Sequence, residues 1–554
     1  MPASDRIPTT LGAADSPRYE LGLMHTALAT VVILGLLGAL LWIVGYHAFA
    51  WFWPAPIWEL TLHDGTVVLG EIVAAETFEE AAGMGAGQGR RVRVMTGNRE
   101  IRPHDHVWID EDEIQKRTRP ADVVRVIRRQ NGDAIGRIVA ARGCDGASVP
   151  TSHPSRLHSV LEEGRALSRE RDDLVLEVGR IRRPLTRLEE RLDVLRRSYR
   201  HDSDEGRRIA DDLHHEIRTL TDELASELAA TRSQIAELER RLASGALLLQ
   251  AGSQRLDVPL GQVLEVRWTN RMSTAKRCAV AVRSGIQFLF TQPREANTEG
   301  GIFPALFGTV LLVLLMSIAV MPLGVLTAVY MTEYAREGPL LRAARHTVNN
   351  LAGVPSIVVG MFGLAFFIYG VGGFVDQKVF SDSLPTPTFG TGGVLWASLT
   401  LALLTVPVVV VATSEGLRAV PSSWREGATA LGATKWQTLR RVVLPAAVPG
   451  MLTGLILAVS RAAGEVAPLM LTGVVKLAPR LPLDSQFPFV HLERKFMHLG
   501  FHIYDISMQS ANVEAVKPMA FATTLVLLGL VVTINLTAII IRRRIRAAYH
   551  LLEG

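Results

Sequence analysis

The stretch from Glu426 to Pro445, EGATALGATKWQTLRRVVLP, is a polar segment between two apolar ones. The residues whose types and spacing matter most here are Glu426, Gly427, Ala428, Gly432, Val442, Leu444 and Pro445. Glycine allows the left-handed turn that ends a helix, and proline interrupts a helix. We therefore expect a helix, a turn at Gly432 and a second short helix that ends at Pro445. Such a compact knob would suit docking of a soluble partner to a membrane protein; the alternative is an amphipathic loop without a partner.

Apolar stretches elsewhere predict that much of the chain lies in a membrane. The chain has 554 residues, of which 48% are hydrophobic, and its mean hydropathy of +0.22 is high for a soluble protein. Six uncharged stretches each supply the roughly 20 apolar residues that a membrane-spanning helix needs. They are residues 21–58, 300–332, 347–375, 383–414, 442–460 and 518–541. We therefore expect six membrane-spanning helices.

Basic residues follow the second, fourth and sixth of these stretches. They are Arg336, Arg342, Arg345, Arg418, Arg425, Lys435, Arg440, Arg441, Arg542, Arg543, Arg544 and Arg546. Because Lys and Arg concentrate in cytoplasmic loops, we expect both termini in the cytoplasm and residues 54–300 on the periplasmic side of a bacterial inner membrane. Topology then explains the net charge of +5 and the pI of 9.3, and we expect no nucleic-acid partner.

The first apolar stretch has the features of a retained membrane anchor. It lacks an A-x-A cleavage site and is longer than the apolar region of a signal peptide. Aromatic residues gather towards its end, as in the belt at a membrane surface, at Trp42, Tyr46, Trp51, Trp53 and Trp58. We expect a cytoplasmic tail at 1–20, a transmembrane helix at 21–53 and a second cytoplasmic tail at 547–554.

Residues 54–154 alternate apolar and polar side chains in short pieces such as WELTLHDGTVVLGEIV, with turn signals at HDG, TGN and QNGD. This alternation predicts a small β-domain of hairpins. Similar pieces return at 244–300, in GALLLQAGSQRLDVPLGQVLEVRW and KRCAVAVRSGIQFLFTQ. We expect them to be strands that complete the same domain.

Between these regions, residues 155–243 change to a heptad pattern. Its apolar positions are Leu174, Val178, Ile181, Leu185, Leu188, Leu192 and Leu195, and then Leu213, Ile217, Leu220, Leu224, Leu228, Ile235, Leu238 and Leu242. This spacing predicts an antiparallel coiled-coil hairpin, with arms of roughly 40 residues and about 60 Å. Pro184 should kink the first arm or open a turn. The Arg and Glu on the other faces predict a solvated exterior or, alternatively, a docking surface.

Cys144 and Cys278 are the two cysteines, and both fall within residues 54–300. An oxidising compartment would permit a disulfide between them. Two free thiols explain the sequence equally well, because the separation of the two residues cannot be read from it. Both alternatives stay open at this point.

No stretch has the features of a catalytic site. The sequence contains no G-x4-G-K-[ST], HExxH, CxxC or nucleophile elbow. His104 and His106 lack a third ligand nearby, which is typical of a surface loop and not of a metal site. We therefore expect no enzyme and no metal or cofactor bound by this chain. If the knob couples the chain to ATP hydrolysis, ATP must bind to another chain.

Arg461 and Glu465 interrupt the fifth apolar stretch, before apolar residues resume as far as Val475. Four residues apart, they would share one helical face and pair. Charges at this depth are costly and usually face a cavity or the bundle interior. A guanidinium fork matches a tetrahedral oxyanion, and a carboxylate can hold it when no substrate is bound. The pair predicts a substrate path or, alternatively, a salt bridge within the bundle; Gly464 and Pro468 favour a broken helix that lines a path.

Three stretches resemble PstA-type permeases of phosphate ABC importers. They are GVPSIVVGMFGLAF from Gly353, EGATALGAT with the following VVLPAAVPG, and SRAAGEVAPLMLTG from Ser460. The second is similar to the EAA-x3-G-x9-I-x-LP coupling loop of ABC importer permeases, with Gly427 in place of an alanine and Val442 in place of an isoleucine. Small residues such as Gly360 and Gly363 in the first stretch permit tight helix crossings. The resemblance covers residues 302–546.

This resemblance implies partners and residue roles. A PstC-type permease would form the path with this chain, a PstB-type ATPase dimer would bind ATP, and a periplasmic binding protein would deliver phosphate. Arg461 and Glu465 would lie on the phosphate path. The ATPase would dock on Glu426, Gly427, Ala428, Gly432, Leu444 and Pro445. Compact members of the family lack a segment such as 54–300, and we hypothesise that its helical hairpin projects into the periplasm and contacts the binding protein or the second permease.

The expected fold class is mainly α. It combines a six-helix type I ABC-importer permease bundle, with five helices in 301–546, and a periplasmic α+β insertion made of a small β-domain and a coiled-coil hairpin. The expected function is that of the permease subunit of an ATP-driven phosphate importer in the inner membrane. The alternatives are a permease for sulfate or molybdate, the PstC-type partner, and a membrane-anchored coiled-coil signalling or scaffold protein. The knob argues against the last, because an anchor needs no ATPase-docking site.

Overall fold

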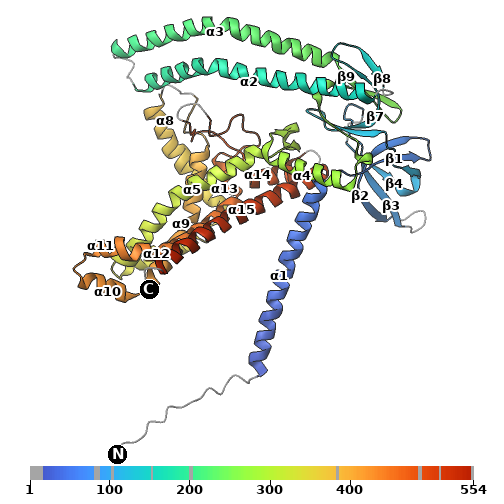
Figure 1. Ribbon diagram of the computed structural model, residues 1–554. Coiled ribbons are helices and arrows are strands. Elements are labelled where there is room, and N and C mark those ends of the chain that lie inside the picture. The colour runs from blue at the N-terminus through green and yellow to red at the C-terminus, as the bar shows by residue number, and fades with distance from the viewer. Residues whose placement is uncertain are drawn as a thin grey trace, which may run out of the picture.

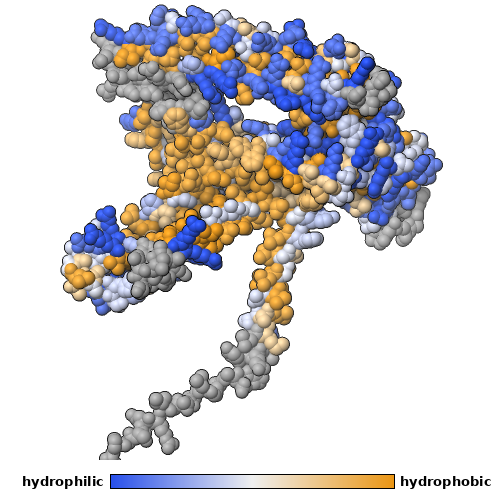
Figure 2. Space-filling model, viewed as in Figure 1, coloured by the Kyte–Doolittle hydropathy of each residue, from blue (hydrophilic) through white to orange (hydrophobic). Residues whose placement is uncertain are grey.

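The computed structural model describes residues 17–79, 88–101, 105–150, 154–198, 204–381, 386–484, 489–510 and 513–550. It consists of a helical bundle and, at one end of it, residues 54–300, which we call the insertion (Figure 1). Figure 2 shows apolar side chains over the bundle and polar ones over much of the insertion. Residues 1–16 and 551–554 of the expected tails lie outside the described residues, as does His104.

Six helices of the described chain are long and apolar enough to cross a membrane, which confirms the expected number. These spans are Met24–Phe52, Phe303–Tyr334, Ser356–Val379, Val394–Arg418, Lys435–Gly464 and Val516–Ile545. The helices that form them are α1 (Pro17–Phe52), α5 (Phe303–Val329), α7 (Ser356–Phe362), α8 (Gly373–Val379), α9 (Val394–Arg418), α11 (Lys435–Thr438), α12 (Leu444–Gly464) and α15 (Val513–His550). Three π-helical segments continue them, at Tyr330–Tyr334, Gly363–Gly372 and Leu439–Val443. Shorter helices are α6 (Pro339–Leu351), α10 (Ser422–Ala430), α13 (Ala467–Thr472) and α14 (Leu499–Tyr504).

α9 forms the centre of the bundle. It packs against both α5 and α12, and 67% of the residues in its most apolar 18-residue stretch are buried. Met316 of α5, Leu401 of α9 and Ala458 of α12 belong to one buried cluster. A Cβ placed on Gly450 of α12 would lie 2.6 Å from the Cα of Gly416 of α9. Glycine therefore permits the close approach of these two helices.

α1 stands apart from the bundle over most of its length. Only 6% of the residues in its most apolar 18-residue stretch are buried, and Figure 1 shows α1 diverging from the other helices. Its contacts lie towards its end at Phe52, where Ala48 is buried and the ring of His47 stacks on that of Phe521 of α15 at 4.7 Å between centroids. One end of α1 therefore attaches it to the rest of the chain.

Among the described residues, the β part of the insertion consists of two larger antiparallel sheets and a two-stranded one, in which β12 (Pro293–Arg294) pairs with β13 (Glu299–Gly300). The first has the order β4-β3-β2-β1-β5 and consists of β1 (Ile57–Leu62), β2 (Val67–Glu79), β3 (Gln88–Met95), β4 (His106–Asp110) and β5 (Ile114–Thr118). The second has the order β10-β9-β7-β6-β11, with β8 on β7, and consists of β6 (Val123–Arg128), β7 (Ala134–Arg142), β8 (Ser148–Pro150), β9 (Ala246–Ala251), β10 (Gln254–Pro259) and β11 (Val263–Arg267). The chain between β8 and β9 forms two long helices, so strands from both sides of these helices build one sheet.

The two long helices lie side by side as a hairpin. They are α2 (Pro154–Ser198) and α3 (Asp204–Ser244). Leu188 and Leu192 of α2 are buried with Leu213 of α3. α2 continues through Pro184, so the turn considered there does not form. In Figure 1 the hairpin extends from the second sheet across the end of the bundle that carries α8. The root of α2, at Leu161, is buried in the core of the second sheet.

The second half of the region expected to be β at 244–300 contains a helix, α4 (Thr274–Phe290), so this part of the prediction is wrong. The alternation in KRCAVAVR is short, and the longer pattern has the helical period. Ala281 and Phe288, seven residues apart, form the buried side of α4. The side chain of Ser273 caps the helix by accepting a hydrogen bond from the backbone N–H of Lys276.

The two cysteines are free thiols, so the disulfide considered above is not present. Cys144 is buried in the core of the second sheet, where a Cβ on Gly245 would lie 3.2 Å from its sulfur. Cys278 lies on the exposed side of α4. The two thiols belong to separate elements with opposite exposure, which the sequence does not reveal.

Candidate functional site

The break between α12 and α13 brings Arg461 and Glu465 together. Arg461 lies in the last turn of α12, and its Nε is 3.4 Å from Oε1 of Glu465. The backbone of Glu465 is extended, with φ −76° and ψ 137°. The expected pair forms, but it closes across the end of α12 and not along one helical face, because Glu465 lies beyond the last helical turn. The two side chains are 33% and 19% exposed, respectively.

Small residues and a proline surround this break. α12 ends at Gly464, and Pro468 lies in the first turn of α13, where its missing N–H is not needed. A Cβ on Gly360 of α7 would lie 2.7 Å from the Cα of Pro468, and one on Gly363 would lie 2.3 Å from Oγ1 of Thr400. The tight crossings expected for this glycine-containing stretch are confirmed, and one of them holds α13 in place beside the break.

The guanidinium of Arg461 has much of its hydrogen-bonding capacity open. Its Nε edge contacts Glu465, and among the residues that the structure describes no other acceptor bonds to its two Nη groups. A guanidinium carries five N–H donors in a planar fork. The pair can therefore offer a doubly donating edge to an anion without first breaking a bidentate contact.

A buried polar segment, which the sequence analysis did not single out, lies beside this break. Its buried polar side chains are His498, His502 and Asp505. Nζ of Lys476 lies 3.1 Å from Oδ2 of Asp505. A Cβ on Gly500 would lie 3.0 Å from Cγ2 of Val466, so α14 packs directly against the break. The two histidines and the aspartate within HLGFHIYD were the available sequence signal.

The polar knob between α9 and α12 has the helix end that its glycine predicts. Gly432 has φ +81°, the left-handed conformation that favours glycine. The N–H of Ala433 bonds to the carbonyl of Ala428 at 3.1 Å, and that of Gly432 to the carbonyl of Thr429 at 2.9 Å. This pair of hydrogen bonds is the Schellman motif, and it ends α10 at Ala430, with four residues before α11 (Lys435–Thr438) begins.

The expected end of the second helix at Pro445 is wrong. Thr434 and Gln437 form a capping box that starts α11. The chain then continues as a π-helical turn, Leu439–Val443, into α12. Pro445 occupies the first turn of α12, where a proline is tolerated because its N–H would have no partner. Leu444 packs against the buried cluster at this end of the bundle.

Ionic and aromatic contacts fix the knob to the bundle. Arg425 of α10 lies 3.0 Å from Glu333, at the end of the span that α5 begins. Nζ of Lys435 donates to the carbonyl of Glu333 and lies 4.8 Å from the ring centroid of Tyr334. Apolar side chains remain exposed on the knob: Trp424 at 41%, Leu431 at 90% and Trp436 at 56%. Glu426, Gly427 and Gly432 are also exposed.

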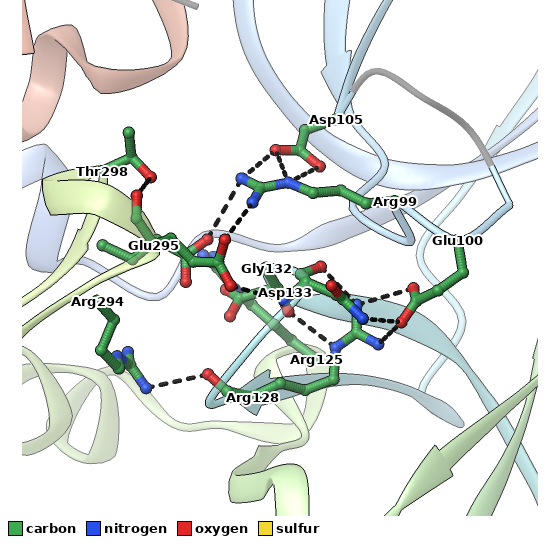
Figure 3. A network of polar contacts seen from close by, with 12 residues as sticks. Arg99, Glu100, Asp105, Arg125, Arg128, Gly132, Asp133, Arg294, Glu295 and Thr298 are labelled. Carbon is green, nitrogen blue, oxygen red and sulfur yellow. Dashed lines mark hydrogen bonds and ion pairs between the residues drawn. The ribbon is translucent and has the colours of Figure 1, made fainter. Parts of the chain in front are cut away.

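At the end of the bundle opposite the knob, an ion-pair network joins the first part of the insertion to its last segment, residues 294–299, which precedes α5 (Figure 3). Arg99 contacts three carboxylates, those of Asp105 at 2.7 Å, Glu295 at 3.4 Å and Glu299 at 3.5 Å. Glu295 and Glu299 lie directly before α5 in sequence. The contacts with Glu295 and Glu299 join residues about 200 positions apart, so they tie the start of the insertion to its end.

Arg128 is the most enclosed arginine of this network, with a side chain 0% exposed. Its Nη1 and Nη2 donate to the two carboxylate oxygens of Glu100 at 2.6 and 3.1 Å. It also donates to the carbonyls of Gly132 and Asn131 at 2.8 and 2.7 Å. Arg294 donates to the carbonyl of Arg128 at 3.0 Å (Figure 3).

The segment before α5 also reaches the membrane bundle directly. Glu295, Ala296 and Asn297 have φ values of +46°, +52° and +74°, which are rare for residues other than glycine. The side-chain amide of Asn297 donates to the carbonyl of Lys476 at 2.7 Å. Lys476 is the residue that pairs with Asp505 beside the break. The network and the break are therefore connected through a short series of contacts.

Burial raises the pKa of two carboxylates in this network. The pKa of Glu299 rises to about 7, because burial disfavours its charged form, the Asp133 carboxylate adds to this effect and Arg99 opposes it. Burial likewise raises the pKa of Glu71, although Arg125 lies 3.0 Å away. Glu299 lies in the segment that leads into α5, so the charge of this network changes near pH 7.

Comparisons with known proteins agree on the bundle. A family model for the inner membrane component of binding-protein-dependent transport systems matches residues 320–547. The phosphate transport system permease protein PstA 1 of Mycobacterium tuberculosis (strain H37Rv) is 35% identical over 243 residues, which cover 44% of this chain and 70% of that protein. The chain belongs to the PstA family of permeases. PstA of Yersinia pestis is 33% identical over 255 residues, which cover 46% of this chain and 77% of that protein.

This membership makes the chain an inner-membrane permease subunit of an ABC importer, a transport protein and not an enzyme. The permease of a bacterial ABC transporter for alginate, a solved structure, is 16% identical and covers 47% of this chain and 83% of its own, with a TM-score of 0.35. The family match begins at residue 320, so it leaves α1 and the insertion unmatched.

Proposed function

We propose that this PstA-type permease moves inorganic phosphate into the cell by alternating access. A second, PstC-type permease would complete the path, two PstB-type ATPase subunits would bind and hydrolyse ATP, and a periplasmic binding protein would deliver phosphate. The names of the PstA relatives, which are phosphate transport permeases, support phosphate as the substrate. The observation that carries the proposal is the open guanidinium of Arg461 at the break between α12 and α13.

Arg461 and Glu465 would act as a substrate-responsive pair. Without substrate, the Glu465 carboxylate neutralises the guanidinium, since an unpaired charge inside a membrane is costly. A phosphate oxyanion can accept hydrogen bonds from the free Nη groups, because the fork of a guanidinium matches two oxygens of a tetrahedral anion. The long 3.4 Å contact to Glu465 leaves this exchange easy.

The knob would couple transport to ATP hydrolysis. The exposed Trp424, Leu431 and Trp436 supply apolar anchors for a docking pocket on the ATPase, next to the acidic Glu426. The Gly432 turn shapes the knob, and Leu444 and Pro445 connect it to α12. The Arg425–Glu333 contact joins the knob to the end of the second span, so a movement of the ATPase would move the helices of the bundle as well.

We place the knob and both termini in the cytoplasm and the insertion in the periplasm. Basic residues around the knob and in the last turns of α15 support this orientation. The insertion and the knob lie at opposite ends of the bundle (Figure 1), as this orientation requires. We further propose that the α2–α3 hairpin, which runs over the periplasmic end of the bundle, contacts the binding protein or the second permease. If a variant that lacks residues 155–243 shows normal phosphate uptake and normal assembly of the complex, this role is excluded.

A competition experiment tests the substrate. Phosphate-starved cells that lack this chain are complemented with it, and uptake of labelled phosphate is measured with excess unlabelled phosphate, sulfate or molybdate. We expect uptake to depend on the chain and to be inhibited by phosphate alone. Inhibition by sulfate or molybdate at equal concentration would instead support the permease of another oxyanion, which an arginine fork serves equally well.

A further inference from the structure

α4 (Thr274–Phe290) has an exposed apolar face. Ala281 and Phe288 form its buried side. On another side, Val282, Ile286 and Phe290 are 64%, 55% and 67% exposed. These three residues are spaced by four and therefore follow one another along one face of the helix. An exposed apolar face of this kind on a helix indicates contact with a partner or a membrane surface.

The position of α4 coincides with the ends of two membrane spans. The ring of Phe288 packs against that of Phe52, the last residue of the first span, with 5.4 Å between centroids. The N–H of Ile302, the residue before the second span, donates to the carbonyl of Phe288 at 2.9 Å. Figure 1 shows α4 beside the end of α1. Since both spans end here, α4 is held at the boundary of the apolar zone.

The charge of α4 matches a phospholipid surface. The helix contains Lys276, Arg277 and Arg283 and no acidic residue. Lys276 and Arg283 lie beside the apolar face on the helix surface and are exposed. Within the described parts of the chain, neither side chain forms an ion pair. Basic side chains at the edge of an apolar helical face are typical of helices that lie in a membrane interface, where they attract anionic headgroups.

We propose that α4 is an interfacial helix embedded in the membrane leaflet on the insertion's side. Its apolar face contacts acyl chains, and Lys276 and Arg283 contact the phosphates of anionic phospholipids. The exposed surface of the neighbouring α1 is also apolar, as expected for a helix in contact with lipid. A second permease would not require basic residues along this edge. The helix thereby fixes the height of the β sheets above the membrane.

The free cysteine on this face provides a direct measurement. The full-length protein in liposomes with anionic phospholipids is labelled at Cys278 with an environment-sensitive fluorophore, because Cys278 is exposed and Cys144 is buried. Two control variants replace Cys278 by serine and carry the reactive thiol elsewhere. One has Gln254→Cys on the exposed surface of β10, and the other has Leu36→Cys within α1. Quenching is measured with iodide in water and with lipids that carry a nitroxide near the headgroup or deep in the acyl chain.

We expect the label at Cys278 to emit at shorter wavelength than the one at Gln254→Cys and to be quenched most by the headgroup nitroxide. The label at Leu36→Cys should be quenched most by the deep nitroxide. Iodide quenching of Cys278 equal to that of Gln254→Cys would overturn the proposal, because α4 would then lie in water. Protection from all three quenchers would also overturn it, because a protein partner would then cover α4.

Two substitutions with the same charge separate the apolar face from its polar edge. Ile286→Glu places a carboxylate in the apolar face, whereas Gln287→Glu places one at the adjoining exposed edge. We expect Ile286→Glu to shift the emission of the Cys278 label towards that of water and Gln287→Glu to leave it nearly unchanged. Equal shifts in both variants, or none in either, would contradict an embedded apolar face.

Discussion

Arg128 in the insertion and Arg461 in the membrane bundle are both enclosed by protein, but their contacts differ. Arg128 is 0% exposed and donates four hydrogen bonds, to Glu100 and two backbone carbonyls. Arg461 is 33% exposed and has one contact of 3.4 Å. An arginine whose donors are satisfied within the chain stabilises the fold, whereas one with open donors can bind a ligand. The two ends of the molecule should therefore respond differently to the same substitution.

The largest expected effect on stability is that of Arg128→Gln. It removes the donors of a fully buried guanidinium from two backbone carbonyls and from Glu100, and leaving such groups unpaired costs about 3 kcal/mol or more in total. Arg137→Gln is the matched control, because Arg137 contacts Glu59 and Asp122 but is 33% exposed. It should cost about 0–1 kcal/mol. Thermal unfolding of the purified protein, with proteolysis of the insertion as a second readout, compares the two; equal losses would contradict the distinction.

A second effect concerns the pH dependence of the junction. Glu299 has a pKa raised to about 7, above the usual value of 4.5, because of burial and the Asp133 carboxylate. The folded protein then binds more protons than the unfolded chain between these values, so the stability of the insertion should fall as pH rises from about 4.5 to about 7. Glu299→Gln should reduce this slope, measured from unfolding temperatures between pH 5 and 7.5. An unchanged slope would show that Glu299 does not titrate in this range.

A smaller effect is expected at the knob, where contacts are left open for a partner. Gly432→Ala forces a side chain into φ +81° and should destabilise the turn by about 1 kcal/mol. Gly427→Ala is the matched control, because Gly427 is helical with open space around its Cα, and alanine favours a helix by about 0.5–1 kcal/mol. Co-purification of the ATPase subunits should weaken for Gly432→Ala and persist for Gly427→Ala. The reverse order would exclude the turn as part of the docking site.

The sequence predicted the features that depend on local pattern. Hydropathy gave the six spans, and the glycine spacing gave the helix end at Gly432. Gly464 and Pro468 indicated the broken helix beside Arg461. Each of these depends on residues close together in the chain, and conformational preferences act over that range.

Features that depend on tertiary contacts were missed or wrong. The short alternation at 276–283 fits both a strand and a helix, and packing of Phe288 against Phe52 favours the helix α4. Contacts such as Arg99 with Glu299 join distant residues that carry no pairing signal in a single sequence. Pro445 did not end its helix, because a π-helical turn before it places proline in a first helical turn.

The central claim is that Arg461 serves the substrate and not the fold. Its most direct test is uptake of labelled phosphate in starved cells that lack this chain, complemented with wild type, Arg461→Gln or Arg137→Gln at equal membrane levels. Losing a charge-assisted hydrogen bond of about 1.5–3 kcal/mol should reduce uptake by about tenfold or more in Arg461→Gln, with unchanged unfolding temperature, while Arg137→Gln transports as wild type. Wild-type uptake by Arg461→Gln would contradict the account.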